Sequence, residues 1–201
     1  LLVGLRYDDF SQEIKNRANG TTSKQDQTQT SPRAGISFDA TPNLTLYGSY
    51  SEGFRPNSGA DFNGTAFEPE ESKSFEVGLK HASSDGRLST TLAYFQMEKS
   101  NVITADPVNA GFSAALGEAE SEGLELDITG ELSDTLRMML TYAYVDAKST
   151  KGVINADWGV EVPAGSPLVN IPEHSANLML VKSFNLNGAP SSAGVSLNYV
   201  D

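Results

Sequence analysis

The sequence predicts an all-β fold, an antiparallel transmembrane β-barrel segment of about nine strands. Three observations lead to this fold class. Apolar and polar residues alternate with a period of two along most of the chain, and helical periodicity is nearly absent. The connections between these candidate strands are short and long in strict turn along the chain. Several runs reach about ten residues, the length that a tilted strand needs to cross a bilayer.

The first three strands are expected at residues 3–9, 33–39 and 44–51. The third shows the pattern well. In LTLYGSYS (44–51) the two leucines and Tyr50 share one face, whereas the threonine, Tyr47 and the serines share the other. Tyr50 lies near the end of this strand that leads into a long connection, where an interfacial aromatic belt is expected.

The next two strands are expected at residues 74–80 and 88–97. In SFEVGLK (74–80) phenylalanine, valine and leucine alternate with serine, glutamate, glycine and lysine. In LSTTLAYFQM (88–97) both faces carry apolar groups, so the sequence leaves open which face of this strand would meet lipid.

The last four strands are expected at residues 123–132, 136–144, 176–184 and 194–200. GLELDITGEL (123–132) has the clearest alternation in the chain, because leucine and isoleucine alternate with glutamate, aspartate and threonine. LRMMLTYAY (136–144) places leucine, methionine and two tyrosines on one face. Alternation of this kind also describes a soluble antiparallel sheet with one wet face.

The lengths of the connections favour a membrane-spanning barrel over a soluble sheet. The short ones contain turn-forming residues and are expected at 39–43, 82–87, 131–135 and 185–193. The long ones are expected at about 11–31, 54–72, 98–119 and 147–173. Outer-membrane barrels sort their connections in this way, with short periplasmic turns and long extracellular loops.

Composition and charge narrow the function. The chain has 201 residues, a net charge of −12 and no cysteine. The charge and the lack of a Lys/Arg cluster argue against nucleic acid as a partner. Zero cysteines exclude a disulfide framework and a thiolate metal site. The sequence contains none of the common nucleophile, phosphate-loop or zinc-protease motifs, so no enzyme is expected.

Several segments resemble the barrel of TonB-dependent outer-membrane receptors, especially those for ferric siderophores. LYGSYSEGFRPN (46–57) is similar to the family strand "YxSYSxGFxP", and FEPEESKSFEVGLKH (67–81) to the segment that opens the next strand. The other similar segments are LLVGLRYDDF (1–10), AESEGLELDITGEL (119–132), with Glu122 where arginine is common, and VNIPEHSANLML (169–180).

The resemblance covers nearly all of the chain. It implies a barrel of about 22 strands, closed by an N-terminal plug and located in the bacterial outer membrane. Such a receptor imports its ligand with energy supplied through TonB. Residues 1–201 would be an internal part of that barrel, with no plug domain in this chain, so the TonB complex would be contacted through a plug outside it.

The phase of the strands predicts which charged residues face the lumen. If the leucines of 123–132 face lipid, the acidic residues between them face inward. The lumen-facing polar residues expected on this basis are Glu76, Lys80, Glu125, Asp127, Glu131 and Arg137, together with Arg6 and Arg33. A lumen network without ligand contact is the main alternative for them. The two histidines, His81 and His174, are expected at the rim.

In a receptor of this kind, ligand contacts are expected in the long connections, because a ferric siderophore presents an apolar scaffold around its chelated ion and aromatic side chains can contact that scaffold. The candidates are Phe54, Arg55, Phe62, Phe67, Phe112 and Trp158, each with loop packing as its alternative. The acidic run FEPEES (67–72) is expected to be a solvated loop that caps the next strand. The iron would arrive chelated by the siderophore, so neither a cofactor nor a protein metal site is expected.

The sequence therefore predicts an outer-membrane receptor that binds and imports a ferric siderophore, in contact with outer-membrane lipid. Two alternatives stay open. The receptor could take another ligand, such as a cobalamin, haem or an oligosaccharide. A surface β-sheet adhesion module that transports nothing belongs to a different class.

Overall fold

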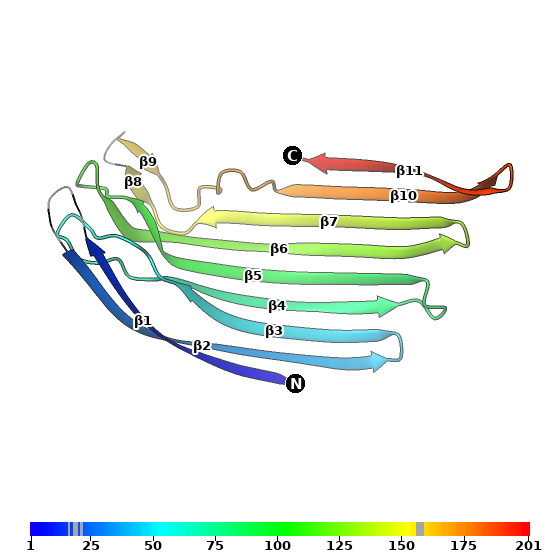
Figure 1. Cartoon of the computed structure of the whole chain (residues 1–201), viewed down its shortest axis with the longest axis horizontal. Helices are drawn as coiled ribbons and strands as arrows, with labels where there is room; N and C mark the ends of the chain where they lie inside the picture. Colours follow the sequence, from blue (N-terminus) through cyan, green and yellow to red (C-terminus); the bar gives the residue numbers. More distant parts are fainter. Residues whose placement is uncertain (16, 18–19, 21, 156–158) are drawn as a thin grey trace.

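Nine strands form one antiparallel sheet, in which each strand pairs with its neighbours along the chain (Figure 1). The structure is a computed structural model and describes residues 1–15, 17, 20, 22–155 and 159–201. Two further strands, β8 and β9, pair with each other within the connection from β7 to β10. The strands are β1 Leu2–Lys15, β2 Thr22–Thr41, β3 Leu44–Arg55, β4 Glu70–Ala82, β5 Leu88–Ala105, β6 Ser113–Ser133, β7 Leu136–Ser149, β8 Val153–Asn155, β9 Val160–Val162, β10 His174–Leu186 and β11 Ala189–Val200.

The predicted sorting of connections is present. The turns β2–β3, β4–β5, β6–β7 and β10–β11 are short and lie together at one end of the sheet (Figure 1). The turn from β10 to β11 consists of Asn187 and Gly188, whose φ angles are 50° and 83°. Asn-Gly suits a two-residue hairpin turn because both of its central positions need positive φ. This turn is therefore shorter than the predicted connection 185–193.

Two of the long connections were predicted to be longer than they are. β1 continues to Lys15 and β2 begins at Thr22, so most of 11–31 is strand. β5 continues to Ala105 and β6 begins at Ser113, which leaves only a tip of 98–119. The ladder extends beyond the part that would cross a bilayer, and there apolar residues no longer occupy one face regularly. Hydrophobic alternation cannot reveal a strand of this kind.

The register separates an apolar face from a polar face. The pairing aligns one apolar row across eight strands: Phe38, Leu46, Leu79, Leu92, Leu126, Tyr142, Ala176 and Tyr199. On the other face it aligns a polar row: Asp39, Thr45, Lys80, Thr91, Asp127, Thr141, Asn177 and Asn198. The pairing also resolves the phase of 88–97, since Leu92 and Tyr94 lie on the apolar face and Ala93 and Phe95 on the polar face.

The sheet is a single layer with almost no core. Among the described residues, only Phe67, Ala93 and Ala147 are buried apolar residues. Large side chains on the apolar face are uncovered by other parts of the chain: Phe38 is 64% exposed and Leu197 is 63% exposed. Water would oppose such exposure by about 25 cal/mol per Å², so the apolar face requires an apolar medium. No helix among the described residues is long and apolar enough to cross a membrane.

Candidate functional site

All the predicted lumen-facing residues lie on the polar face. The register places Glu76, Lys80, Glu125, Asp127, Glu131, Arg137, Arg6 and Arg33 opposite the apolar row. Tyr47 donates a hydrogen bond to Glu76 Oε1 over 2.7 Å, and Lys80 Nζ lies 5.3 Å from the centre of the Tyr47 ring. At the end with the short turns, Arg137 Nε lies 3.4 Å from Glu131 Oε1. The polar face thus carries at least two separate groups of contacts between these side chains.

Two tyrosines lie on the apolar face toward the end with the long connections. Tyr50 donates a hydrogen bond to Glu52 over 2.5 Å, and Tyr94 donates one to Glu122 over 2.7 Å. In both cases the ring lies on the apolar side and the hydroxyl binds the first carboxylate beyond it. Tyrosine takes this arrangement at a membrane–water interface. The two hydroxyls therefore mark the outer edge of the apolar band, which is the part of the apolar face that would lie in the hydrocarbon core.

The two histidines lie at opposite ends of the sheet. His81 is exposed at the end of β4, next to a short turn. His174 begins β10, and its Nδ1 lies 2.9 Å from the hydroxyl of Tyr142. Its ring centre is 5.2 Å from that of Tyr144. Both histidines therefore lie at the edges of the apolar band.

Four of the six predicted ligand contacts lie in or directly before the connection 56–69, and Phe62 and Phe67 are the two within it. Phe54 and Arg55 end β3 directly before it. By the register, Phe54 lies on the side of Tyr50 and Arg55 on the polar side. The last pair between β2 and β3 is Arg33 with Ser51. Beyond that pair, the guanidinium carbon of Arg6 lies 6.0 Å from the centre of the Phe54 ring.

Two predicted aromatic residues meet across two connections. Phe62, in 56–69, and Phe112, at the tip between β5 and β6, form an edge-to-face pair with ring centres 5.0 Å apart. Phe62 is 52% exposed and Phe112 43% exposed. Their contact presents one continuous aromatic surface beyond the end of the sheet. Trp158 lies outside the described residues.

Phe67 differs from these two residues. It is only 6% exposed, and a side chain at Gly59 would come within 2.9 Å of its ring. The carbonyl of Phe67 accepts a hydrogen bond of 2.5 Å from the buried Gln25 side chain of β2. The structure thus assigns Phe67 to the packing of its own connection, which was the alternative considered from the sequence.

The acidic run 67–72 was predicted to be a solvated loop, and this is wrong for Glu70. Glu70 begins β4 and is 8% exposed. Its Oε2 lies 2.8 Å from Arg55 Nη2, and its Oε1 lies 3.2 Å from Lys99 Nζ of β5. Sequence reasoning missed Glu70 and Lys99 as members of the site. The alternation of Glu70 with Ser72, Ser74 and Glu76 was the available signal, since it places Glu70 on the polar face.

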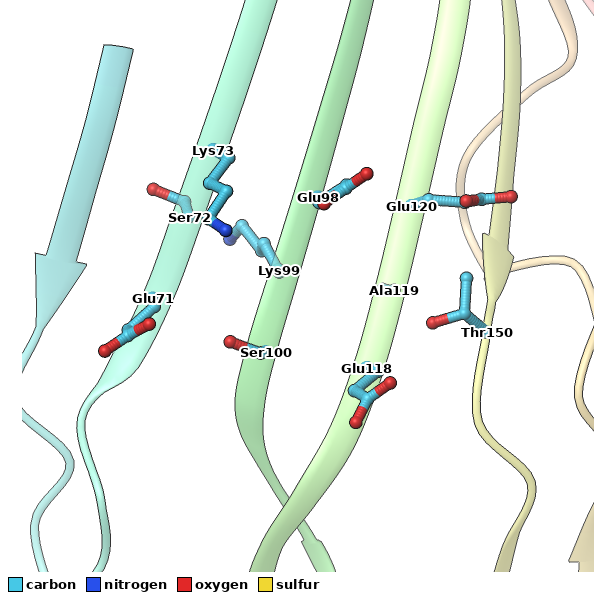
Figure 2. A pocket seen from close by; sticks show the side chains of 10 residues that line it. All are labelled: Glu71, Ser72, Lys73, Glu98, Lys99, Ser100, Glu118, Ala119, Glu120 and Thr150. Carbon is cyan, nitrogen blue, oxygen red and sulfur yellow. The ribbon is translucent and has the colours of Figure 1, made fainter. Parts of the chain in front are cut away.

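A polar hollow of about 310 Å³ lies at the outer ends of β4, β5 and β6 (Figure 2). Its lining residues are Glu71, Ser72, Lys73, Glu98, Lys99, Ser100, Glu118, Ala119, Glu120 and Thr150. Lys73 and Glu98 are register partners on the side that carries Phe75. The hollow therefore opens mainly on the continuation of the apolar face, away from Arg55. Among the described residues, no group of three or more His, Cys, Asp or Glu side chains could hold a metal ion.

Glu120, which lines this hollow, forms an ion pair with a lysine of the next strand. Lys148 of β7 lies 3.2 Å from Glu120 and 3.4 Å from Asp146. The hydrogen bonds from Lys148 to Glu120 and Asp146 raise the pKa of the Lys148 ammonium group above its ordinary value. Lys148 is therefore held between two carboxylates and stays cationic at physiological pH.

Comparisons with known proteins agree with this geometry. The family model described as "TonB dependent receptor-like, beta-barrel" matches residues 1–201. The metal-pseudopaline receptor CntO of Pseudomonas aeruginosa (strain UCBPP-PA14) is 41% identical over 99% of this chain and 28% of its own length. The ferrichrome outer membrane transporter/phage receptor of Escherichia coli (strain K12) is 34% identical over 88% of this chain and 22% of its own length.

A solved structure shows the same architecture. The siderophore receptor PiuA from Acinetobacter baumannii superposes with a TM-score of 0.76 and 27% identity, over 99% of this chain and 30% of that one. The chain thus spans less than a third of the length of these proteins. Because the family match extends over every residue and agrees with the observed sheet, the chain belongs to the TonB-dependent receptors and forms part of their outer-membrane β-barrel.

Proposed function

We propose that the chain supplies barrel wall and ligand-capturing loops to a receptor that imports a ferric siderophore across the outer membrane, with energy supplied through TonB. The segregation of the apolar and polar rows across eight strands is the observation that carries this proposal. It gives the wall one side for lipid and one side for a polar interior, as transport barrels have. The names of the relatives supply the class of ligand.

The residues have separate roles in this proposal. Phe62 and Phe112, as one exposed pair, contact the ligand, and Arg55, Phe54 and Trp158 are the other candidates. The polar-face residues hydrogen-bond the plug or line water inside the barrel. That plug, outside residues 1–201, relays ligand binding to TonB. The siderophore itself supplies the ligands of the iron.

A second candidate ligand is a metal chelate whose metal is not restricted to iron. One relative, 41% identical over 99% of this chain, is described as a metal-pseudopaline receptor, whereas two others are described for ferrichrome and ferrioxamine B. These three names share a metal held by an organic chelator. None of the three is described for cobalamin, haem or an oligosaccharide, or as an adhesion module.

Uptake by whole cells tests the proposal. The gene for the complete receptor is deleted and restored on a plasmid, and cells are fed radioactive iron, zinc or nickel chelates under limitation for each metal. We expect deletion to lower uptake of at least one chelate to background and the plasmid to restore it. Unchanged uptake of every chelate in the deletion strain would exclude the import of metal chelates.

A further inference from the structure

Three side chains from neighbouring strands form an ion cluster at the outer end of the polar face. Arg55 is the last residue of β3, Glu70 the first of β4, and Lys99 lies in β5. Arg55 Nη2 lies 2.8 Å from one oxygen of Glu70, and Lys99 Nζ lies 3.2 Å from the other. Two cations share one carboxylate, so the cluster keeps one net positive charge.

Burial differs sharply among the three groups. The Glu70 side chain is 10% exposed, whereas that of Arg55 is 72% exposed and that of Lys99 44% exposed. A buried carboxylate is stable only when it is paired, so Glu70 fixes both cations. Among the described residues, Glu70 is the acceptor that binds the Arg55 guanidinium. The other N–H groups of that guanidinium face the solvent and can donate to a ligand.

The opposite face of the sheet carries a net negative charge near the same outer ends of the strands. The register aligns one row there: Glu52, Lys73, Glu98, Glu120 and Lys148. Three carboxylates against two ammonium groups leave this row with one net negative charge. The chain as a whole has a net charge of −12. The cluster of Arg55, Glu70 and Lys99 is thus a local positive centre in an acidic wall, and it lies on the inward side.

The cluster also closes the base of the connection that carries the exposed aromatic pair. Arg55 directly precedes residues 56–69 and Glu70 directly follows them, so their ion pair joins the two ends of this connection. Phe62, from the same connection, forms half of the pair with Phe112. The same connection thus has a fixed positive centre at its base and contributes one ring of an exposed aromatic pair. This combination suits a ligand with an apolar shell and negatively charged groups.

We propose that Arg55 and Lys99, held in place by Glu70, form an anion-selecting element of the ligand site, so that the receptor favours metal chelates with a net negative charge. Carboxylate-rich chelates are the class that fits, because a guanidinium fork and an ammonium group both bind carboxylate oxygens. This inference rests on the proposed import function and adds to it the charge of the ligand.

The test uses the complete receptor in the outer membrane and chelates that differ in charge. The probes are iron(III) citrate and a zinc aminopolycarboxylate as anions, ferrichrome as a neutral chelate and ferrioxamine B as a cation, each with a radioactive metal. The variants are Arg55→Gln and Lys99→Gln. Arg55→Lys keeps the charge, and Lys73→Gln removes the same charge from the opposite side. The amount of receptor at the cell surface is measured for every variant.

We expect the receptor to bind an anionic probe most tightly, and Arg55→Gln and Lys99→Gln each to weaken that binding about tenfold. Arg55→Lys should retain most of it, and Lys73→Gln should change it by less than about twofold. A preference for the neutral or cationic probe, or an equal loss from Lys73→Gln, would overturn the inference and leave the import function standing. Failure to take up any metal chelate would overturn both.

Discussion

Glycine residues on the polar face make room for aromatic rings of the neighbouring strand. Tyr47 is the register partner of Gly78, and Phe95 is the partner of Gly123. A side chain at Gly78 would come within 2.7 Å of the Tyr47 ring and 2.6 Å of the Leu92 carbonyl. A ring that covers a glycine protects the exposed backbone of that strand. These pairs keep the polar face close-packed at Gly78 and Gly123.

Gly78→Ala tests this arrangement. We expect it to destabilise the complete receptor by about 1–3 kcal/mol, because the added methyl group overpacks against backbone that cannot move away. Gly48→Ala is the matched control on β3, since the nearest atom to its added methyl group would lie 3.7 Å away. The midpoint of thermal unfolding of the purified receptor in detergent is the measurement. Equal midpoints for the two variants would contradict the close packing of Tyr47 on Gly78.

Neighbouring positions on β6 test the two faces. Leu126 belongs to the apolar row and Asp127 to the polar row. Leu126→Lys should cost about 2–4 kcal/mol, because it places a charge in the lipid core. Asp127→Lys changes a side chain on the inward side and should cost much less. Folded receptor is quantified on unboiled gels after urea treatment. A larger loss from Asp127→Lys would reverse the assignment of the faces.

At the residue scale, the sequence predicted the face of the sheet on which a side chain lies better than it predicted which side chains meet in the connections. Alternation predicts the side of a strand on which Glu76 or Asp127 lies, because that side follows from the period of two. It could not predict that Phe62 meets Phe112 and that Phe67 is buried, because all three residues lie in connections. Their positions depend on hydrogen bonds between segments far apart in the sequence, such as that from Gln25 to Phe67.

The connection 56–69 is an element with a defined structure of its own. Asn57, which is 5% exposed, donates hydrogen bonds of 2.8 Å to the carbonyls of Glu68 and Asn101. Asn101 in turn donates one of 3.0 Å to the carbonyl of Pro69. These bonds fasten the connection to itself and to β5. The exposed Phe62 is thereby carried on a fixed frame.

Asn57→Ala should release this frame, because it leaves the carbonyl groups of Glu68 and Asn101 without the buried donor that binds both. We expect hydrogen exchange of the amides in 58–69 to become about tenfold faster or more, while the strands exchange as before. Asn63→Ala is the control, since Asn63 is exposed and bonds Asp61 through its backbone N–H. Equal acceleration in both variants would show that Asn57 does not hold the connection.

The tip between β5 and β6 depends on one carboxylate. Asp106 accepts hydrogen bonds from the side chain of Asn109 and from the backbone N–H groups of Asn109 and Val108. The bond from the Asn109 side chain, followed by the two backbone bonds, lowers the pKa of the Asp106 carboxyl. A lowered pKa in the folded state means that the ionised form stabilises the tip above the unfolded pKa of about 3.9.

The order of the tip should therefore depend on pH. We expect the protection factors of the Val108 and Asn109 amides, corrected for intrinsic exchange at each pH, to be constant from pH 7 down to about 4 and to fall below it. Asp106→Ala should show the low protection at every pH. Protection that already falls between pH 7 and 5 would contradict a role for ionised Asp106.

At the element scale the sequence predicted the strands as far as the apolar band extends and not beyond it. β6 has 21 residues, which at about 3.3 Å each would extend to about 70 Å, whereas a hydrocarbon core is about 30 Å thick. The outer part of β6, from Ser113 to Glu122, has polar residues on both sides. Its strand structure comes from pairing with β5, which a period-two pattern of hydrophobicity does not record.

On the scale of the whole molecule, the sheet is one layer whose two sides need different surroundings. Its order follows the chain without a crossover in the nine-stranded sheet, and the short turns lie at one end (Figure 1). The all-β class, the nine strands and the sorting of connections were predicted from sequence and are confirmed. They could be predicted because a lipid-facing sheet must alternate at every pair of positions. The ligand could not, because loop contacts follow no such rule.

The central claim is that the apolar row faces lipid in a receptor that spans the outer membrane. The chain has no cysteine, so single cysteines can carry a spin label at each position from Leu124 to Ile128 in the complete receptor, after any cysteines outside this segment are replaced. Collision with oxygen reports lipid, and collision with a water-soluble nickel chelate reports water. We predict high oxygen collision at 124, 126 and 128 and low values at 125 and 127. Uniform access of the nickel chelate to all five positions would contradict the claim.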